Sequence, residues 1–71
     1  MNKVFGFGGY QLSCTAVADS GGKFEPTVVA ARNEWPSRPR VLAIERTKHE
    51  TPEEAIDTAY RQGVRWVNEH G

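Results

Sequence analysis

Residues 51–71, TPEEAIDTAYRQGVRWVNEHG, decide the fold, because their pattern is that of one amphipathic helix with a marked start. Thr51 suits the N-cap, Pro52 the first helical position, and Glu54, three residues after the cap, completes a capping box. At 100° per residue, the apolar and small residues fall on one half of the helical wheel: Ala55, Ile56, Ala59, Tyr60, Gly63, Val64, Trp66 and Val67. Such a helix needs a hydrophobic surface to cover.

The chain before this helix predicts three strands that supply that surface. Residues 10–18 alternate between apolar and polar side chains, and the glycines of 19–22 mark a turn into a second strand over 23–32. Pro26 lacks an N–H, so we expect a bulge or an unpaired position there. Residues 33–39, with two prolines, form a loop before a third strand over 40–47. The prediction is an α+β fold: a three-stranded antiparallel meander sheet with one C-terminal helix packed on one face, β-β-β-α.

The length of 71 residues predicts a single domain over 1–71. Residues 1–9 contain a glycine-rich stretch, VFGFGG, that either extends the first strand through a glycine bulge or forms a flexible arm. These glycines lead into a strand and not into a helix, which argues against a dinucleotide-binding turn.

Gly63 lies in the middle of the apolar side of the helix, although glycine inside a helix costs about 1 kcal/mol relative to alanine. We therefore expect the helix backbone to approach the sheet closely at Gly63.

Composition limits the classes of function. Cys14 is the single cysteine, so an internal disulfide is excluded, and we expect a reducing, cytoplasmic setting. We also expect a soluble chain, since no apolar run is long enough to span a membrane. Cys14, His49 and His70 lie in unrelated segments without a zinc-binding or nucleophile–base spacing. The expectation is a protein that is not an enzyme and needs neither cofactor nor metal.

A single helix covers only one side of a three-stranded sheet, and the other side is left for water, a second copy or a partner. The expected residues of that side are Thr15, Val17, Glu25, Thr27, Val29 and Ala31. We therefore predict a non-enzymatic binding domain that acts by self-association or by capture of a small protein partner. The predicted partner-binding residues are Val17, Val29 and Ala31 on the open face, with Trp35 and Arg38 in the long loop.

The order of strands and the helix start, Thr51-Pro52-Glu53-Glu54-Ala55-Ile56, resemble the HicB-type antitoxin domain. That domain has a truncated ribonuclease-H-like β-β-β-α fold in which T-x-E-E-A opens the helix. The sequence from Ala59 to Val67 is also similar to the A-x-x-x-G-x-x-W-[IV] helix of small uncharacterised bacterial proteins. The resemblance implies binding to a toxin protein. Residues 1–71 contain neither the proline-containing segment that the antitoxins have after the second strand nor a DNA-binding domain.

An alternative is a module that binds nucleic acid through the sheet face and the basic loop between Arg32 and Arg40. The formal net charge is zero, but residues 23–48 hold six cations against three carboxylates, and residues 49–71 hold two against five. Trp35 with Arg32, Arg38 and Arg40 would combine a stacking ring with cations for the phosphate backbone.

Overall fold

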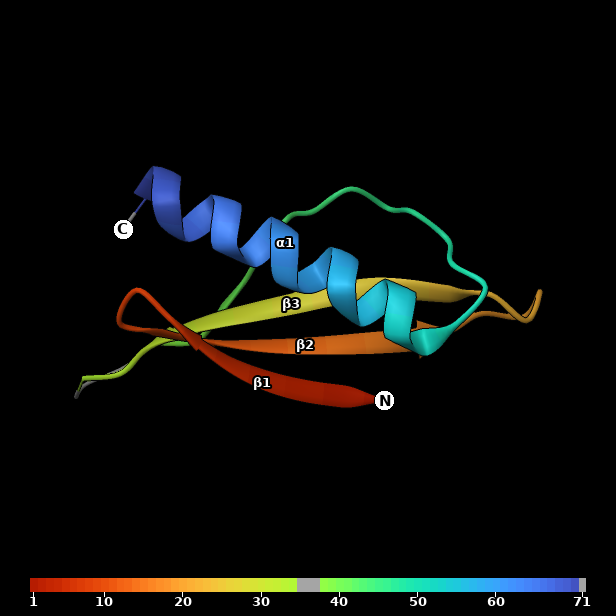
Figure 1. Ribbon diagram of the computed structural model, residues 1–71, viewed down its shortest axis with the longest axis horizontal. Helices are drawn as coiled ribbons and strands as arrows, with labels where there is room; N and C mark the ends of the chain where they lie inside the picture. Colours follow the sequence, from red (N-terminus) through yellow and green to blue (C-terminus); the bar gives the residue numbers. More distant parts are fainter. Residues whose placement is uncertain (35–37, 71) are drawn as a thin grey trace.

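The computed structural model describes residues 1–34 and 38–70 and has a four-stranded antiparallel sheet with one helix on one of its faces (Figure 1). The strands are β1 (Asn2–Phe7), β2 (Tyr10–Ala18), β3 (Phe24–Arg32) and β4 (Arg40–Val41), in the spatial order β1-β2-β3-β4. Helix α1 (Pro52–His70) follows β4 and lies diagonally across the sheet. The α+β meander with a C-terminal helix is therefore confirmed, with one strand more than predicted.

The additional strand is β1. It is formed by the N-terminal segment, for which the sequence allowed either an extension of the first strand or a flexible arm. It pairs antiparallel with β2 from Asn2 opposite Thr15 to Phe7 opposite Tyr10. Gly8 and Gly9 connect the two strands with φ values of 56° and 80°. Two successive residues with positive φ are the requirement of a type I′ hairpin turn, and glycine meets it without steric cost.

The strand predicted over 40–47 was too long, because the ladder between β3 and β4 ends after Val41. Leu42 N–H still donates to Val28 C=O at 3.0 Å, and His49 exchanges two hydrogen bonds of 2.9 Å with Phe24. Pro26 lies between Val28 and Phe24, and its backbone faces the same edge of β3 as these hydrogen bonds. Proline has no N–H, so it cannot donate a hydrogen bond at that edge. Seven residues between Val41 and His49 run beside four residues of β3 between Val29 and Phe24, so the excess residues loop out opposite Pro26, where a bulge or an unpaired position was expected.

Helix α1 begins as the sequence predicts. The Glu54 N–H donates to Thr51 Oγ1 at 3.2 Å, and the Thr51 hydroxyl donates to the Glu54 carboxylate at 3.2 Å. Ion pairs four residues apart lie on the solvent side of the helix, between Asp57 and Arg61 at 2.7 Å and between Arg65 and Glu69 at 3.4 Å. On the opposite side, Ala55, Ile56, Ala59, Gly63 and Val67 are buried.

The core lies between α1 and the helix-facing residues of the sheet, centred on the fully buried side chains of Leu12, Cys14 and Val28. Phe5 and Phe7 of β1 close one edge of this core, and the Phe5 ring lies 4.5 Å from the ring of Tyr60. Leu42 and Ile44 close the other edge, although they lie outside any strand. The sheet and helix therefore enclose one hydrophobic core.

The turn between β2 and β3 is fixed by Asp19. Its Oδ1 accepts hydrogen bonds from the N–H groups of Gly21 and Lys23, at 2.8 and 2.9 Å, and its Oδ2 pairs with Lys48 Nζ at 2.8 Å. Lys23 in turn contacts Glu50. These ion pairs attach the segment before α1 to the turn, and the hydrogen bond from Lys48 is the main reason that the pKa of Asp19 falls from 3.8 to about 2.

Candidate functional site

The side of the sheet turned away from α1 is the first candidate surface. The strand register places on this side a set of residues that we call the uncovered face: Asn2, Val4, Gly6, Gln11, Ser13, Thr15, Val17, Glu25, Thr27, Val29, Ala31 and Val41. Within the described residues, α1 is the only helix, and it lies on the other side of the sheet (Figure 1). The side chains of this face are therefore free of a covering element in that part of the chain.

Valine side chains are unusually exposed on the uncovered face. Val4 is 58% exposed, Val17 47% and Val41 76%, and Met1 is the one other large hydrophobic residue with comparable exposure among the described residues. Val4, Ser13, Val29 and Val41 are successive partners across β1, β2, β3 and β4. A row of valines interrupted by one serine therefore crosses the full width of the sheet.

The rest of the uncovered face is polar but almost free of charge. Glu25 is its only ionisable residue, and the Glu25 carboxylate lies 3.9 Å from Lys48 Nζ. Asn2 donates a hydrogen bond to the Thr15 hydroxyl at 3.2 Å. A neutral surface of valine, threonine, serine and amide side chains suits contact with another protein surface better than contact with a phosphate backbone.

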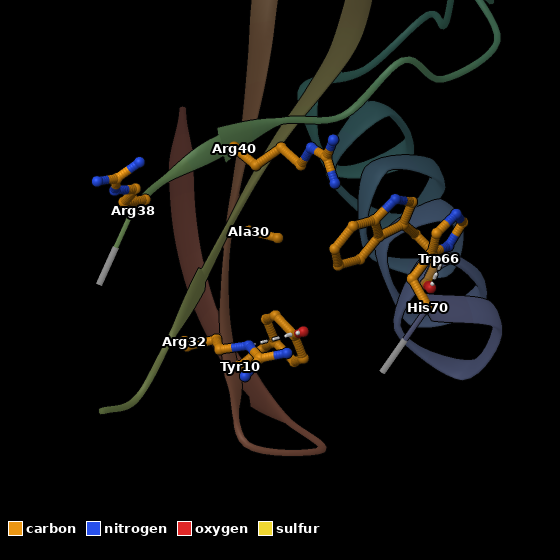
Figure 2. Close-up of a pocket in the computed structure, with 7 residues that line it drawn as sticks. All are labelled: Tyr10, Ala30, Arg32, Arg38, Arg40, Trp66 and His70. Atoms are coloured by element: carbon orange, nitrogen blue, oxygen red, sulfur yellow. Dashed lines mark hydrogen bonds between the residues drawn. The ribbon is translucent and has the colours of Figure 1, made fainter. Parts of the chain in front are cut away.

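A second candidate lies on the other side of the sheet, between β3, β4 and the end of α1. A cavity of about 410 Å³ there, which we call the basic pocket, is lined by Tyr10, Ala30, Arg32, Arg38, Arg40, Trp66 and His70 (Figure 2). Ala30 and Tyr10 are buried and come from the sheet, whereas Trp66 and His70 come from the last turns of α1. The small side chain of Ala30 leaves the space that the larger residues surround.

Two guanidinium groups of the basic pocket, those of Arg32 and Arg40, are in contact with aromatic rings. The Trp66 and His70 rings are stacked at 4.9 Å, and the Tyr10 ring meets Trp66 edge-on at 5.6 Å. The Arg32 guanidinium lies 5.6 Å from the centre of the Tyr10 ring, and its Nε donates to the Tyr10 hydroxyl at 3.2 Å. The Arg40 guanidinium lies 5.9 Å from the centre of the Trp66 ring. These contacts limit the freedom of two cationic side chains at the pocket wall.

The charge of the basic pocket is only partly compensated. Arg32 pairs with Glu34 at 3.5 Å, and both side chains are largely exposed. Within residues 1–34 and 38–70, no carboxylate lies within ion-pair distance of Arg38 or Arg40. In Figure 2 the Arg38 guanidinium lies at the outer side and is turned away from Trp66, so Arg32 and Arg40 are the cations nearest the aromatic rings. The pocket therefore offers cationic donors to an anion.

The predicted partner-binding residues fall on different surfaces. Val17, Val29 and Ala31 lie on the uncovered face. Arg38 lines the basic pocket, and Trp35 lies outside the described residues. Arg32 and Arg40 belong to the helix side of the sheet, so the arginines and the uncovered face do not form one continuous surface. Binding of nucleic acid stays a prediction. Either the uncovered face or the basic pocket would have to bind it without the other.

Sequence reasoning missed two groups of site residues. Val4 and Val41 were not assigned to the uncovered face, because β1 was not predicted and the register of β4 was unknown. Tyr10, Trp66 and His70 were read as parts of the core and the helix end. The spacing of Phe5 and Phe7 about Gly6 was a usable signal for a strand that would place Val4 on its other side, whereas no local pattern joins Tyr10 to Trp66.

The remaining side chains that could act in catalysis or bind a metal do not form one site in the described part of the chain. Cys14 is fully buried, and burial raises the pKa of its thiol to about 11, so a reactive thiolate is disfavoured. His49 Nε2 lies 2.8 Å from the Thr47 hydroxyl. In the described part of the chain, no group of three or more His, Cys, Asp or Glu side chains is arranged to hold a metal ion.

Comparison of this chain with protein-family models, with curated proteins and with solved structures finds no match. Over residues 1–34 and 38–70, no helix has the length and apolar character needed to span a membrane.

Proposed function

We propose that this protein is a non-enzymatic binding domain that associates with a second copy of itself through the uncovered face. The observation that carries the proposal is the position of Val4, Val17 and Val41: all three lie on the one side of the sheet that α1 does not cover. Exposed apolar side chains gathered on one face are typical of an interaction surface, whereas scattered ones need no explanation.

A copy of the same face is a suitable occupant because the face is nearly uncharged. Each of two such sheets brings only one ionisable side chain of the face, Glu25, to the contact, and sheets that pack face to face lie about 10 Å apart, with their side chains interdigitated. The valine row would supply the apolar contact, and Ser13, Thr15 and Thr27 would supply hydroxyl groups for hydrogen bonds around it. A two-fold arrangement would let the same patch serve both subunits.

Capture of a different small protein on the same face is the second candidate. The resemblance of Thr51-Pro52-Glu53-Glu54-Ala55 to the helix start of the HicB-type antitoxin domain favours it. In this version a toxin-like partner would occupy the uncovered face, and the isolated chain would remain monomeric. The two candidates share one surface and differ in the occupant.

Sedimentation velocity over a range of protein concentrations tests the proposal. We expect the wild type to form a dimer as concentration rises, and Val41→Lys to remain monomeric because it places a charge in the valine row. Asn68→Lys, which adds the same charge on the exposed side of α1, is the matched control and should dimerise like the wild type. A wild type that stays monomeric at millimolar concentration would remove self-association and leave the partner-capture version.

A further inference from the structure

We propose that the basic pocket binds a nucleotide, with its phosphate held by Arg40 and its sugar and base lying against Tyr10 and Trp66. The pocket lies on the helix side of the sheet. The inference therefore does not depend on the self-association proposed above.

Arg40 is assigned to the phosphate, because its guanidinium group has no carboxylate partner among the described residues, whereas Arg32 lies at the Tyr10 end of the pocket and pairs with Glu34 (Figure 2). A guanidinium group presents paired N–H donors that match the oxygens of a phosphate group, and such charge-assisted bonds are stronger than neutral ones. Both groups are already placed over aromatic rings, at 5.6 Å from Tyr10 and 5.9 Å from Trp66, so binding would order them little further. The nearest competitor in the described chain is Glu34, whose exposed contact with Arg32 at 3.5 Å is weak.

Size and aromatic surface argue for more than a bare phosphate ion. A volume of about 410 Å³ falls within the range of roughly 300–1,000 Å³ that small-molecule pockets occupy. The buried wall consists of Tyr10 and Ala30, and Trp66 adds a half-buried indole. Guanidinium groups beside aromatic side chains match a nucleoside monophosphate, either free or as one unit of a single strand.

The ligand is tested by titrating the protein with AMP, ribose 5-phosphate, adenosine and inorganic phosphate at low salt. Heteronuclear NMR would follow the indole N–H of Trp66, assigned with Trp66→Phe, and the amide of Ala30. We expect AMP to shift both signals and to bind more tightly than each of the other three compounds. No shift at the pocket with millimolar AMP, or binding of ribose 5-phosphate, phosphate or adenosine as tight as that of AMP, would overturn the proposal.

Matched arginine variants test the site. Arg40→Ala should weaken AMP binding about 10-fold or more, since a hydrogen bond to a charged group contributes about 1.5–3 kcal/mol. Arg40→Lys keeps the charge without the forked geometry, so its loss should be smaller. Arg61→Ala removes the same charge from the outer side of α1, where Arg61 pairs with Asp57. An equal loss of affinity in Arg61→Ala would mean that only net charge matters, and would contradict a specific pocket.

A short single-stranded oligonucleotide distinguishes the two sources of the nucleotide. Tighter binding of the strand than of AMP, with a steep dependence on salt and the same sensitivity to Arg40→Ala, identifies a nucleic-acid strand. Equal or weaker binding of the strand identifies a free nucleotide. Either result supports nucleotide recognition at the basic pocket.

Discussion

A Cβ atom built on Gly63 would lie 3.0 Å from Cδ1 of Leu12, closer than side-chain carbons ordinarily pack. It would also lie 3.3 Å from a methyl group of Val28. Leu12 and Val28 are fully buried residues of β2 and β3, so the backbone of α1 rests directly on the centre of the core. The close approach expected from the sequence at Gly63 is confirmed.

Gly63→Leu should therefore destabilise the fold by about 2 kcal/mol, because inserting a large side chain into a packed core forces neighbours apart. For a domain of this size, thermal unfolding monitored by circular dichroism should show a melting temperature lower by roughly 8–16 °C. Asn68→Leu, an equally apolar substitution at an exposed position of α1, is the control and should change it little. An unchanged melting temperature in Gly63→Leu would rule out close packing at this point.

Gly9→Ala should destabilise the β1–β2 hairpin. Its φ of 80° is unfavourable for any residue with a Cβ, at a cost of about 1–2 kcal/mol, while the added carbon itself would touch nothing within 4 Å. Gly6→Ala is the matched control, because Gly6 also has free space but an ordinary strand conformation. Urea unfolding at low protein concentration should give a lower midpoint for Gly9→Ala than for the wild type. The midpoint of Gly6→Ala should be close to that of the wild type. Equal midpoints for both variants would contradict the positive-φ turn.

Asp19 should make stability depend on pH in the acid range. Its pKa is lowered from 3.8 to about 2 in the folded chain, first by the hydrogen bond from Lys48. The unfolded chain thus binds the proton more readily, so the carboxylate stabilises the fold above about pH 4, and this contribution is lost as the pH falls towards 2. The difference in unfolding free energy between the wild type and Asp19→Asn should therefore become smaller as the pH falls from about 4 to about 2.

NMR titration of the Asp19 carboxyl carbon checks the cause. In Lys48→Gln the pKa of Asp19 should move back towards 3.8, because the largest source of the shift is removed. A titration midpoint near 3.8 in the wild type would contradict the ion pair with Lys48.

Cys14 should be inert in the folded protein. Its thiol is fully buried and burial raises its pKa to about 11, so both access and thiolate formation are suppressed at pH 8. We expect labelling by a disulfide reagent to be slow in buffer and fast after unfolding in urea, measured by absorbance. Equal labelling rates for the folded and the unfolded chain would contradict the burial of Cys14.

Local patterns in the sequence predicted the elements that depend on local rules. The cap at Thr51, the apolar side of α1 and the alternation of β2 all follow from residues a few positions apart, and the structure contains each of them. A bulge or an unpaired position was also predicted at Pro26, and the β3–β4 ladder does not extend to it. The number of residues that loop out opposite Pro26 depends on where β4 ends. No local sequence rule gives the end of β4.

The two candidate surfaces could be predicted only in part, because they depend on register and on contacts between distant segments. The valine row exists only when Val4, Ser13, Val29 and Val41 are brought opposite one another across four strands. The basic pocket joins residue 10, residues 30–40 and residues 66–70. The sequence predicted the cations of the basic loop, but their aromatic neighbours come from the start of β2, through Tyr10, and from the end of α1, through Trp66.

The most direct test of the uncovered face as a docking surface is the access of a dissolved paramagnetic probe to its methyl groups, measured by NMR over a dilution series. At high protein concentration we expect the methyl groups of Val4, Val17, Val29 and Val41 to be shielded, and dilution should expose them to the probe. The Thr58 methyl group on α1 should show constant access at every concentration. Full access of the four valines to the probe at millimolar protein concentration would contradict self-association through this face.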